Sequence, residues 1–268
     1  MLRKSVAFLK KDFLLESSYR ISFLFNMFGV LMSVLGYFFI DKLFGQRIVG
    51  HLQEFGVSYF SYVLLGMAFF NYIGVGLGSF SARIRAEQYM GTLEAILMTP
   101  TSGSVVLFSM ALWNLFMATM DMVVYIILGA SLFKIDFSHI NIFSTVVTSI
   151  LTLVCFSSLG IISASFIMVF KQGNPVGWVI NQMEGLLGGV YFPITVLPSW
   201  LQIVAKFFPI TYSIRAIQLA VYRGYSVIQL IKEIIFLSCF CILLLPLSLI
   251  FFRYALKKVK KQGSLAQY

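Results

Sequence analysis

Apolar runs of about twenty residues divide this chain, and they limit its fold more than any other feature. They cover roughly residues 21–40, 57–80, 105–132, 142–170, 176–192 and 234–252. A helix of about 20 apolar residues crosses the hydrocarbon core of a bilayer. Inside lipid each backbone N–H and C=O group needs a partner within the protein, which favours helices. The runs therefore predict an all-α integral membrane protein with six transmembrane helices.

The composition agrees with a single transmembrane permease domain over residues 1–268. Hydrophobic residues make up 59% of the chain and charged residues 11%, too little charge to cover the surface of a soluble domain. The formal net charge is +10, but the basic residues lie at the ends of the apolar runs. That placement favours anionic lipid headgroups over nucleic acid as their partner.

Residues 1–20 precede the first run and have an apolar stripe at helical spacing, formed by Leu2, Val6, Leu9 and Phe13. We expect an interfacial helix on the membrane surface, with a frayed basic tail as the alternative. No cleavage site of small residues follows the first run, so we expect that span to be retained.

The connections predict the orientation, because Lys and Arg accumulate in cytoplasmic segments. An even number of spans puts both termini on one side. The connections on the other side contain only Lys42, Arg47, Lys134, Lys206, Arg215, Arg223 and Lys232, fewer than the remaining Lys and Arg. We therefore expect both termini and residues 81–104 to be cytoplasmic, with the chain in the plasma or inner membrane.

Two acidic residues interrupt the apolar runs. Asp121 follows Asn114 by seven positions in the third run, and Glu184 lies near Asn181 in the fifth. A carboxylate in the hydrocarbon is costly, so each should face protein or water. Two interpretations stay open: these side chains line a translocation pathway, or they are protonated or hydrogen-bonded packing residues.

Small residues mark two candidate packing faces. Gly74 and Gly78 in the second run form a small-xxx-small face where another helix could approach closely. In the fourth run the small residues are Ser157, Ser158, Gly160, Ser163, Ala164 and Ser165, for which we favour packing over substrate contact.

Residues 81–104 separate two apolar runs and contain a short capped helix. Gly91 interrupts the preceding helix, and Thr92 can cap a new one whose first turn contains Glu94. Pro100 prevents the helix from continuing past Thr99. A helix of about two turns is marginal alone, so it must lie against other protein or on the lipid interface.

A second segment, residues 189–224, is broken by Pro193, Pro198 and Pro209 but is apolar between them. Pieces this short cannot span a bilayer. We interpret residues 193–224 as an outer re-entrant or interfacial helical segment, whose backbone groups are satisfied by protein or by a water-filled cavity.

The pattern G-T-L-E-x-x-x-x-T-P, between the second and third runs, resembles the membrane subunits of ABC exporters of the type-two permease family. There this piece is the coupling helix, which lies in a groove of the ATPase subunit. The resemblance gives Gly91, Thr92, Glu94, Thr99 and Pro100 their roles, and we add Arg83, Arg85, Glu87, Leu93 and Leu97 as candidate ATPase-coupling residues. Gln88, Tyr89 and Met90 stand where the family often has further charges.

The 189–224 segment is also similar to that family, which has a re-entrant helical hairpin after its fifth span. The matching residues are Phe192, Pro193, Leu197, Pro198, Trp200, Leu201, Pro209, Thr211 and Tyr212. Many relatives have an acidic residue soon after the tyrosine, whereas this chain has Arg215.

The motifs that are absent indicate that the chain is not an enzyme by itself. It has no Gly-Lys pair and hence no P-loop, and it has neither H-E-x-x-H nor G-x-S-x-G. Cys155, Cys239 and Cys241 lie in apolar runs, and His51 and His139 are isolated, so we expect no metal site. We expect no cofactor on this chain, with ATP and Mg used by a partner ATPase.

The resemblance implies a permease subunit of an ATP-driven exporter, paired with a second copy or a related permease and with two ATPase subunits. An aromatic, apolar pathway suits an amphipathic cargo such as a drug, a lipid or a lipid-linked glycan. The alternative is an ATP-independent channel or secondary transporter that uses Asp121 and Glu184.

Overall fold

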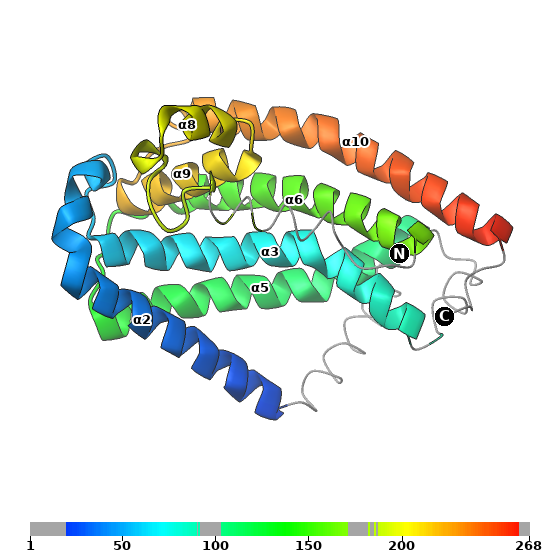
Figure 1. The fold of residues 1–268 in the computed structure, drawn as a ribbon, viewed down its shortest axis with the longest axis horizontal. Coiled ribbons are helices and arrows are strands. Elements are labelled where there is room, and N and C mark those ends of the chain that lie inside the picture. Colours follow the sequence, from blue (N-terminus) through cyan, green and yellow to red (C-terminus); the bar gives the residue numbers. More distant parts are fainter. Residues whose placement is uncertain are drawn as a thin grey trace.

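The computed structural model describes residues 20–89, 91, 103–170, 182, 185 and 187–262, and within these ranges the chain is helical with no strand (Figure 1). The long helices are α2 (Arg20–Leu52), α3 (Tyr59–Tyr89), α5 (Gly103–Phe133), α6 (Ile142–Phe170) and α10 (Ile231–Gln262). The short ones are η1 (Ile194–Val196), α8 (Ser199–Ala205) and α9 (Pro209–Tyr222).

Each long helix contains one of the predicted apolar runs. Among the described residues, three helical segments are long and apolar enough to cross a membrane: Tyr59–Ala86, Ile142–Phe170 and Ile231–Val259. A shorter apolar stretch, Leu115–Ser131, lies within α5. The all-helical membrane class is thus confirmed. The count of six spans stays a prediction, because most of the fifth run lies outside the described residues, as does the proposed interfacial helix at residues 1–19.

Polar side chains define where several helices begin. The Ser58 hydroxyl accepts a hydrogen bond from the Ser61 N–H ahead of α3, and the Asn141 side chain accepts one from the Ser144 N–H ahead of α6. Such caps satisfy N–H groups that have no partner inside the helix. Gly91, at a φ of +67°, forms a turn beyond the end of α3, a conformation that favours glycine.

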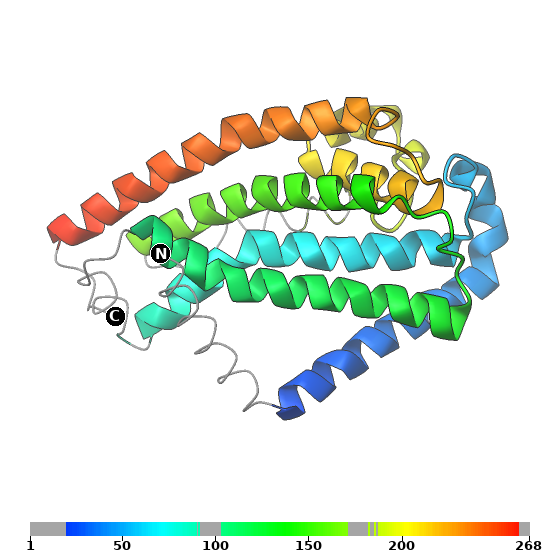
Figure 2. The ribbon, with the colours of Figure 1, turned by 180° about the vertical axis from the view of Figure 1, so that it is seen from behind.

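The long helices run side by side, except that α2 diverges from the others along its length (Figures 1 and 2). Helix α6 packs against α10 and α3, α3 packs against α5, and α9 fits against α6, α10 and α3. We call the end that contains η1, α8 and α9 the hairpin end. We call the opposite end, where α3 and α10 finish and α5 starts, the tail end.

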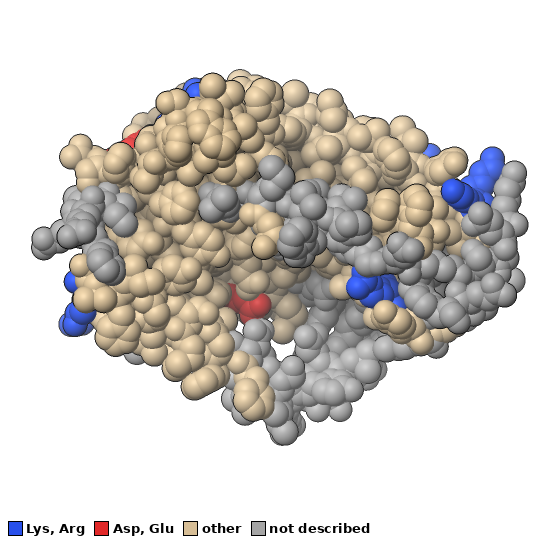
Figure 3. All heavy atoms as spheres, viewed as in Figure 1, with Lys and Arg blue, Asp and Glu red and all other residues tan. Residues whose placement is uncertain are grey.

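The charged side chains on the surface are also concentrated at the two ends of the molecule (Figure 3). Over the middle of the molecule the described atoms are mostly neither basic nor acidic, and the basic side chains lie toward the two ends of the long axis. A broad uncharged band bounded by Lys and Arg is typical of a chain that crosses a bilayer.

The main core lies at the hairpin half, between α3, α6 and α9. Its fully buried members include Leu65, Phe69, Cys155, Phe156, Val190, Ile210, Ile214, Ile217 and Val221. The small-residue side of α6 is buried as predicted: Ser158, Gly160, Ser163, Ala164 and Ser165 all lie inside. This burial agrees with a packing role for that face.

Glycines allow α3 and α6 to approach closely, although not the glycines that the sequence suggested. A Cβ on Gly160 would lie 2.6 Å from the Leu77 carbonyl oxygen and 2.7 Å from that of Gly76. Among the described residues, a Cβ on Gly74 or Gly78 would meet nothing within 4 Å. The close approach of α3 and α6 is therefore at Gly76 and Gly160, and a close contact of Gly74 and Gly78 with another helix stays a prediction.

We predict opposite effects for two glycine-to-alanine changes. Gly160→Ala should lower the free energy of unfolding by about 1–3 kcal/mol, because the added methyl group forces α6 away from the α3 backbone. Gly74→Ala should leave it unchanged or raise it by up to about 1 kcal/mol, since alanine is the better helix former and the space is open. Thermal unfolding of both variants in detergent measures the difference, and equal destabilisation would contradict the α3–α6 contact.

Candidate functional site

Helix α3 extends past the apolar run toward the predicted coupling segment. The helix continues to Tyr89, so the backbone of Arg83, Arg85 and Glu87 is helical. Gly91 is exposed, and a Cβ there would contact nothing within 4 Å. The prediction that Gly91 interrupts the helix is confirmed. Thr92, Leu93, Glu94, Leu97, Thr99 and Pro100 lie outside the described residues, so their role stays a prediction.

The predicted pathway residues are only partly described. Asp121 is half-buried on α5, one helical turn before the buried Tyr125. The backbone of Asn114 belongs to α5, but its side chain lies outside the described part of the chain, as do Asn181 and Glu184. The structure thus leaves both interpretations of these residues open.

Each proline of the 189–224 segment starts a helical turn. Pro193 precedes η1, Pro198 precedes α8, and Pro209 is the first residue of α9. Proline suits these positions because its fixed φ matches a helix start and no N–H group is left without a partner. The prediction of a segment broken into short helices is confirmed.

Hydrogen bonds hold α8 against α9. The Thr211 hydroxyl donates to the Ala205 carbonyl oxygen at 2.7 Å, and the Tyr212 hydroxyl donates to that of Lys206 at 3.0 Å. The Tyr212 ring stacks on Phe236 of α10, with 4.5 Å between ring centroids. Trp200 is 66% exposed, while Phe192 is half-buried and Pro193 buried. The helical pair is therefore a fixed body.

Helix α9 is almost entirely buried and binds the start of α3 through polar side chains. The Tyr222 hydroxyl donates to the Ser61 carbonyl oxygen at 2.6 Å, and the Gln218 side chain donates to that of Tyr62 at 3.2 Å. The Tyr62 hydroxyl donates in turn to the Gly189 carbonyl oxygen at 2.6 Å. These contacts join α3, α9 and the segment ahead of η1 away from solvent.

The connection between α5 and α6 closes the C-terminal end of α9. The Asn141 N–H donates to the Ala220 carbonyl oxygen at 3.0 Å. Gly224 has a φ of +64°, and a Cβ there would lie 2.5 Å from the His139 carbonyl oxygen. A side chain at position 224 would thus be excluded by both conformation and space.

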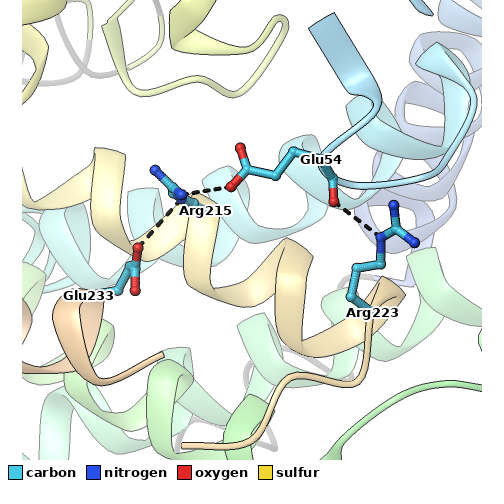
Figure 4. A network of polar contacts seen from close by, with 4 residues as sticks. All are labelled: Glu54, Arg215, Arg223 and Glu233. Atoms are coloured by element: carbon cyan, nitrogen blue, oxygen red, sulfur yellow. Dashed lines mark hydrogen bonds and ion pairs between the residues drawn. The ribbon is translucent and has the colours of Figure 1, made fainter. Parts of the chain in front are cut away.

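The polar centre of the hairpin end is an arginine between two carboxylates (Figure 4). The Arg215 Nη2 atom on α9 lies 2.6 Å from Glu54 Oε1 in the α2–α3 turn, and Arg215 Nε lies 3.4 Å from Glu233 Oε1 on α10. The Glu233 side chain is 7% exposed, whereas those of Arg215 and Glu54 are about half exposed. A carboxylate as buried as Glu233 needs a nearby cation or donor.

Arg223, at the C-terminal end of α9, also binds the α2–α3 turn. Its Nε donates to the Glu54 carbonyl oxygen at 3.1 Å, and its Nη2 donates to that of Gln53 at 2.8 Å. A Cβ on Gly56 would lie 2.7 Å from the Arg223 guanidinium carbon. We refer to Glu54, Arg215, Arg223 and Glu233 as the Arg215 clasp. It links the α2–α3 turn, α9 and α10.

The sequence did not identify the clasp, although it drew attention to Arg215 as a departure from the family pattern. The signal that was available is the position of Arg215 on an otherwise uncharged helix, where a charged residue needs a partner. Its partners depend on tertiary structure, because Glu54 is 161 positions away.

The described residues include charged contacts that join separate elements of the fold. Among them no group of three or more His, Cys, Asp or Glu side chains could hold a metal ion. What the hairpin end provides is a charged link between three elements, at the opposite end of the molecule from the Gly91 turn.

Comparison with known families gives one match. A family model described as ABC-2 type transporter matches residues 5–222, which covers α2 through α9. No curated protein matches the chain.

We predict that Arg215 stabilises the hairpin end more than either glutamate does. Arg215→Gln should lower the free energy of unfolding by about 1–2 kcal/mol, a value reduced for the partial exposure of the pair, because Glu233 loses its cation. Glu54→Gln should cost less than half as much, since Arg215 still serves Glu233.

Lys232→Gln is the matched control, because Lys232 is exposed beside Glu233. Thermal unfolding in detergent compares the three variants. If Arg215→Gln were no more destabilising than Lys232→Gln, the clasp would contribute nothing to the stability of the hairpin end.

Proposed function

Because the chain belongs to the ABC-2 type transporter family, we propose that it is the transmembrane subunit of an ATP-driven exporter. Members of this family are membrane components of transporters, and the ATPase is carried by separate subunits. The family match over residues 5–222 is the observation that carries the proposal. In this proposal two copies of the chain, or this chain and a related permease, form the pathway, and two ATPase subunits bind from the cytoplasm.

The arrangement of the tail end supports a docking site for the ATPase. Helix α3 continues to Tyr89, and the Gly91 turn then starts residues 92–99, the proposed coupling helix. The same end of the molecule contains the C-terminal part of α10, where Arg253 and Lys257 are exposed. Basic residues at this end favour a cytoplasmic orientation for it. The hairpin end is then the outer end, and α8 and α9 are its re-entrant hairpin.

The proposed cargo is amphipathic: a drug, a lipid or a lipid-linked glycan. The described spans have few ionisable groups, so the proposed pathway has apolar walls interrupted by groups such as the half-buried Asp121. A hydrophilic solute would have to lose its hydration shell along such walls, whereas an amphipathic molecule keeps part of its surface in contact with apolar side chains. ATP and Mg are bound by the partner ATPase and not by this chain.

We predict that the left-handed turn at Gly91 sets the direction of the coupling segment. Gly91→Ala should place a strain of about 1–2 kcal/mol on this turn, because L-residues avoid that conformation. Relaxation of the strain would move residues 92–99 relative to α3. ATP hydrolysis by the complex should continue while ATP-driven transport in vesicles falls at least severalfold. Glu94→Gln should have the same effect, because the docking carboxylate is lost.

The matched control is Gly36→Ala, since a Cβ on Gly36 contacts nothing within 4 Å and its φ lies outside the left-handed region. Hydrolysis and uptake of a fluorescent lipid into inside-out vesicles are measured on the same preparations. Uptake by the purified chain without nucleotide or ATPase would contradict the proposal and would favour the ATP-independent carrier.

A further inference from the structure

Helix α10 carries the clasp residue Glu233 at its start and reaches from the Arg215 clasp to the tail end. It contains 32 residues, and the clasp residue Glu233 lies in its first turn. Val259 lies in its last turns and is 2% exposed. At a rise of about 1.5 Å per residue, some 39 Å of helix separate Glu233 from Val259. Figures 1 and 2 show α10 arching along α6 over this distance.

The far end of α10 is packed into the protein instead of extending as a free tail. Phe252, Ala255 and Val259 share one face of the helix and are each less than 5% exposed. They belong to a cluster that also contains Phe80 and Ile84 of α3 and Ala164 and Met168 of α6. We call these seven residues the tail cluster. The opposite face of α10 carries Arg253, Tyr254 and Lys257, all exposed.

The tail cluster lies directly ahead of the proposed coupling segment. Ile84 is 2% exposed, and about 8 Å of helix separate it from Tyr89, the last residue of α3. Helices pressed together over a buried apolar contact move as bodies, because packed side chains cannot be compressed. A displacement of residues 92–99 would therefore move the last turns of α3 and, through the tail cluster and its α6 residues, the end of α10.

The middle of α10 packs against α6 and contains a proline at which the helix can bend. Leu237 is fully buried, and the Cys241 thiol donates to the Leu151 carbonyl oxygen of α6 at 3.2 Å. Pro246 lies inside the helix, where it removes one backbone hydrogen bond. The N-terminal half of α10 is thus held against α6. At Pro246, between that half and the tail cluster, the helix can bend.

We propose that Phe252, Ala255 and Val259 position α10 in the tail cluster together with α3 and α6, so that movement of the coupling segment reaches the Arg215 clasp through α10. The inference rests on the proposed function and adds the route inside the chain. The Arg215–Glu233 contact of the clasp then has two states, formed and broken. When Glu233 moves away from Arg215, α9 is released from α10. Helix α9 remains attached to the α2–α3 turn through Glu54 and Arg223.

Two neighbouring phenylalanines make a matched test. Phe252 is 4% exposed in the tail cluster, whereas Phe251 is 48% exposed and lies outside it. Phe252→Ala and Phe251→Ala remove the same side chain from consecutive positions of the same helix. Ile84→Ala breaks the cluster from the α3 side and provides a second variant, independent of any folding defect specific to Phe252→Ala.

The readout is a pair of distances between spin labels in the complex with the ATPase. Cys155 and Cys239 are replaced by alanine, and Cys241 by serine, which keeps a donor for the Leu151 carbonyl oxygen. Labels at Ser199 on α8, which is held on α9, and at Lys232 on α10 report on the hairpin end, and both residues are exposed. Labels at Ala82 on α3 and Arg253 on α10, also exposed, report on the tail end. Distances are measured by electron–electron resonance before and after trapping with ATP and vanadate.

In the unaltered complex and in Phe251→Ala, trapping should change the hairpin distance, while the tail distance stays the same because α10 follows α3. In Phe252→Ala and Ile84→Ala the hairpin distance should lose at least half of its nucleotide-dependent change, and the tail distance should change because α3 moves without α10. A full change at the hairpin end in both cluster variants would overturn this inference alone. Absence of any nucleotide-dependent change in either distance, in the unaltered complex and in both cluster variants, would overturn the proposed function itself.

Discussion

The hairpin end depends on burying a short helix, α9, on nearly all sides. Its backbone and side chains are removed from water, so each polar group must find a partner within the chain. The carbonyl oxygens at the start of α3 accept hydrogen bonds from Gln218 and Tyr222, and Ser213 pairs with Thr152 on α6 at 3.0 Å. With these hydrogen bonds in place, α9 can act as the common neighbour of α3, α6 and α10.

One consequence is that the two regions of functional interest share the same long helices. Helix α3 begins beside α9 and ends at the Gly91 turn, and α10 begins at Glu233 and ends in the tail cluster. In the proposed exporter, the mechanical work comes from the partner ATPase. Helices fixed at both ends by defined contacts are suited to carrying that work across the bilayer.

The sequence predicted the features that depend on local chemistry. Apolar length identified the helices, the prolines at 193, 198 and 209 marked three helix starts, and Gly91 marked the turn after α3. From hydropathy alone, the second apolar run was predicted to end at residue 80. The helix itself, α3, continues to Tyr89, because Arg and Glu are good helix formers outside the hydrocarbon.

Features that depend on tertiary contacts were not predictable. The partners of Arg215 come from two other elements, and nothing in its local sequence identifies them. The choice between Gly74 and Gly160 as the site of close approach depends on how α3 is rotated toward α6, which spacing alone does not fix.

The side of the membrane on which residues 92–99 lie tests the central claim most directly. A single cysteine at Ala95, in a chain without its native cysteines, can be labelled with a membrane-impermeant maleimide in intact cells and in inside-out vesicles. The account predicts labelling in the inside-out vesicles alone, with protection when the ATPase subunit is bound. Labelling of intact cells at this position would contradict a coupling segment driven by a cytoplasmic ATPase.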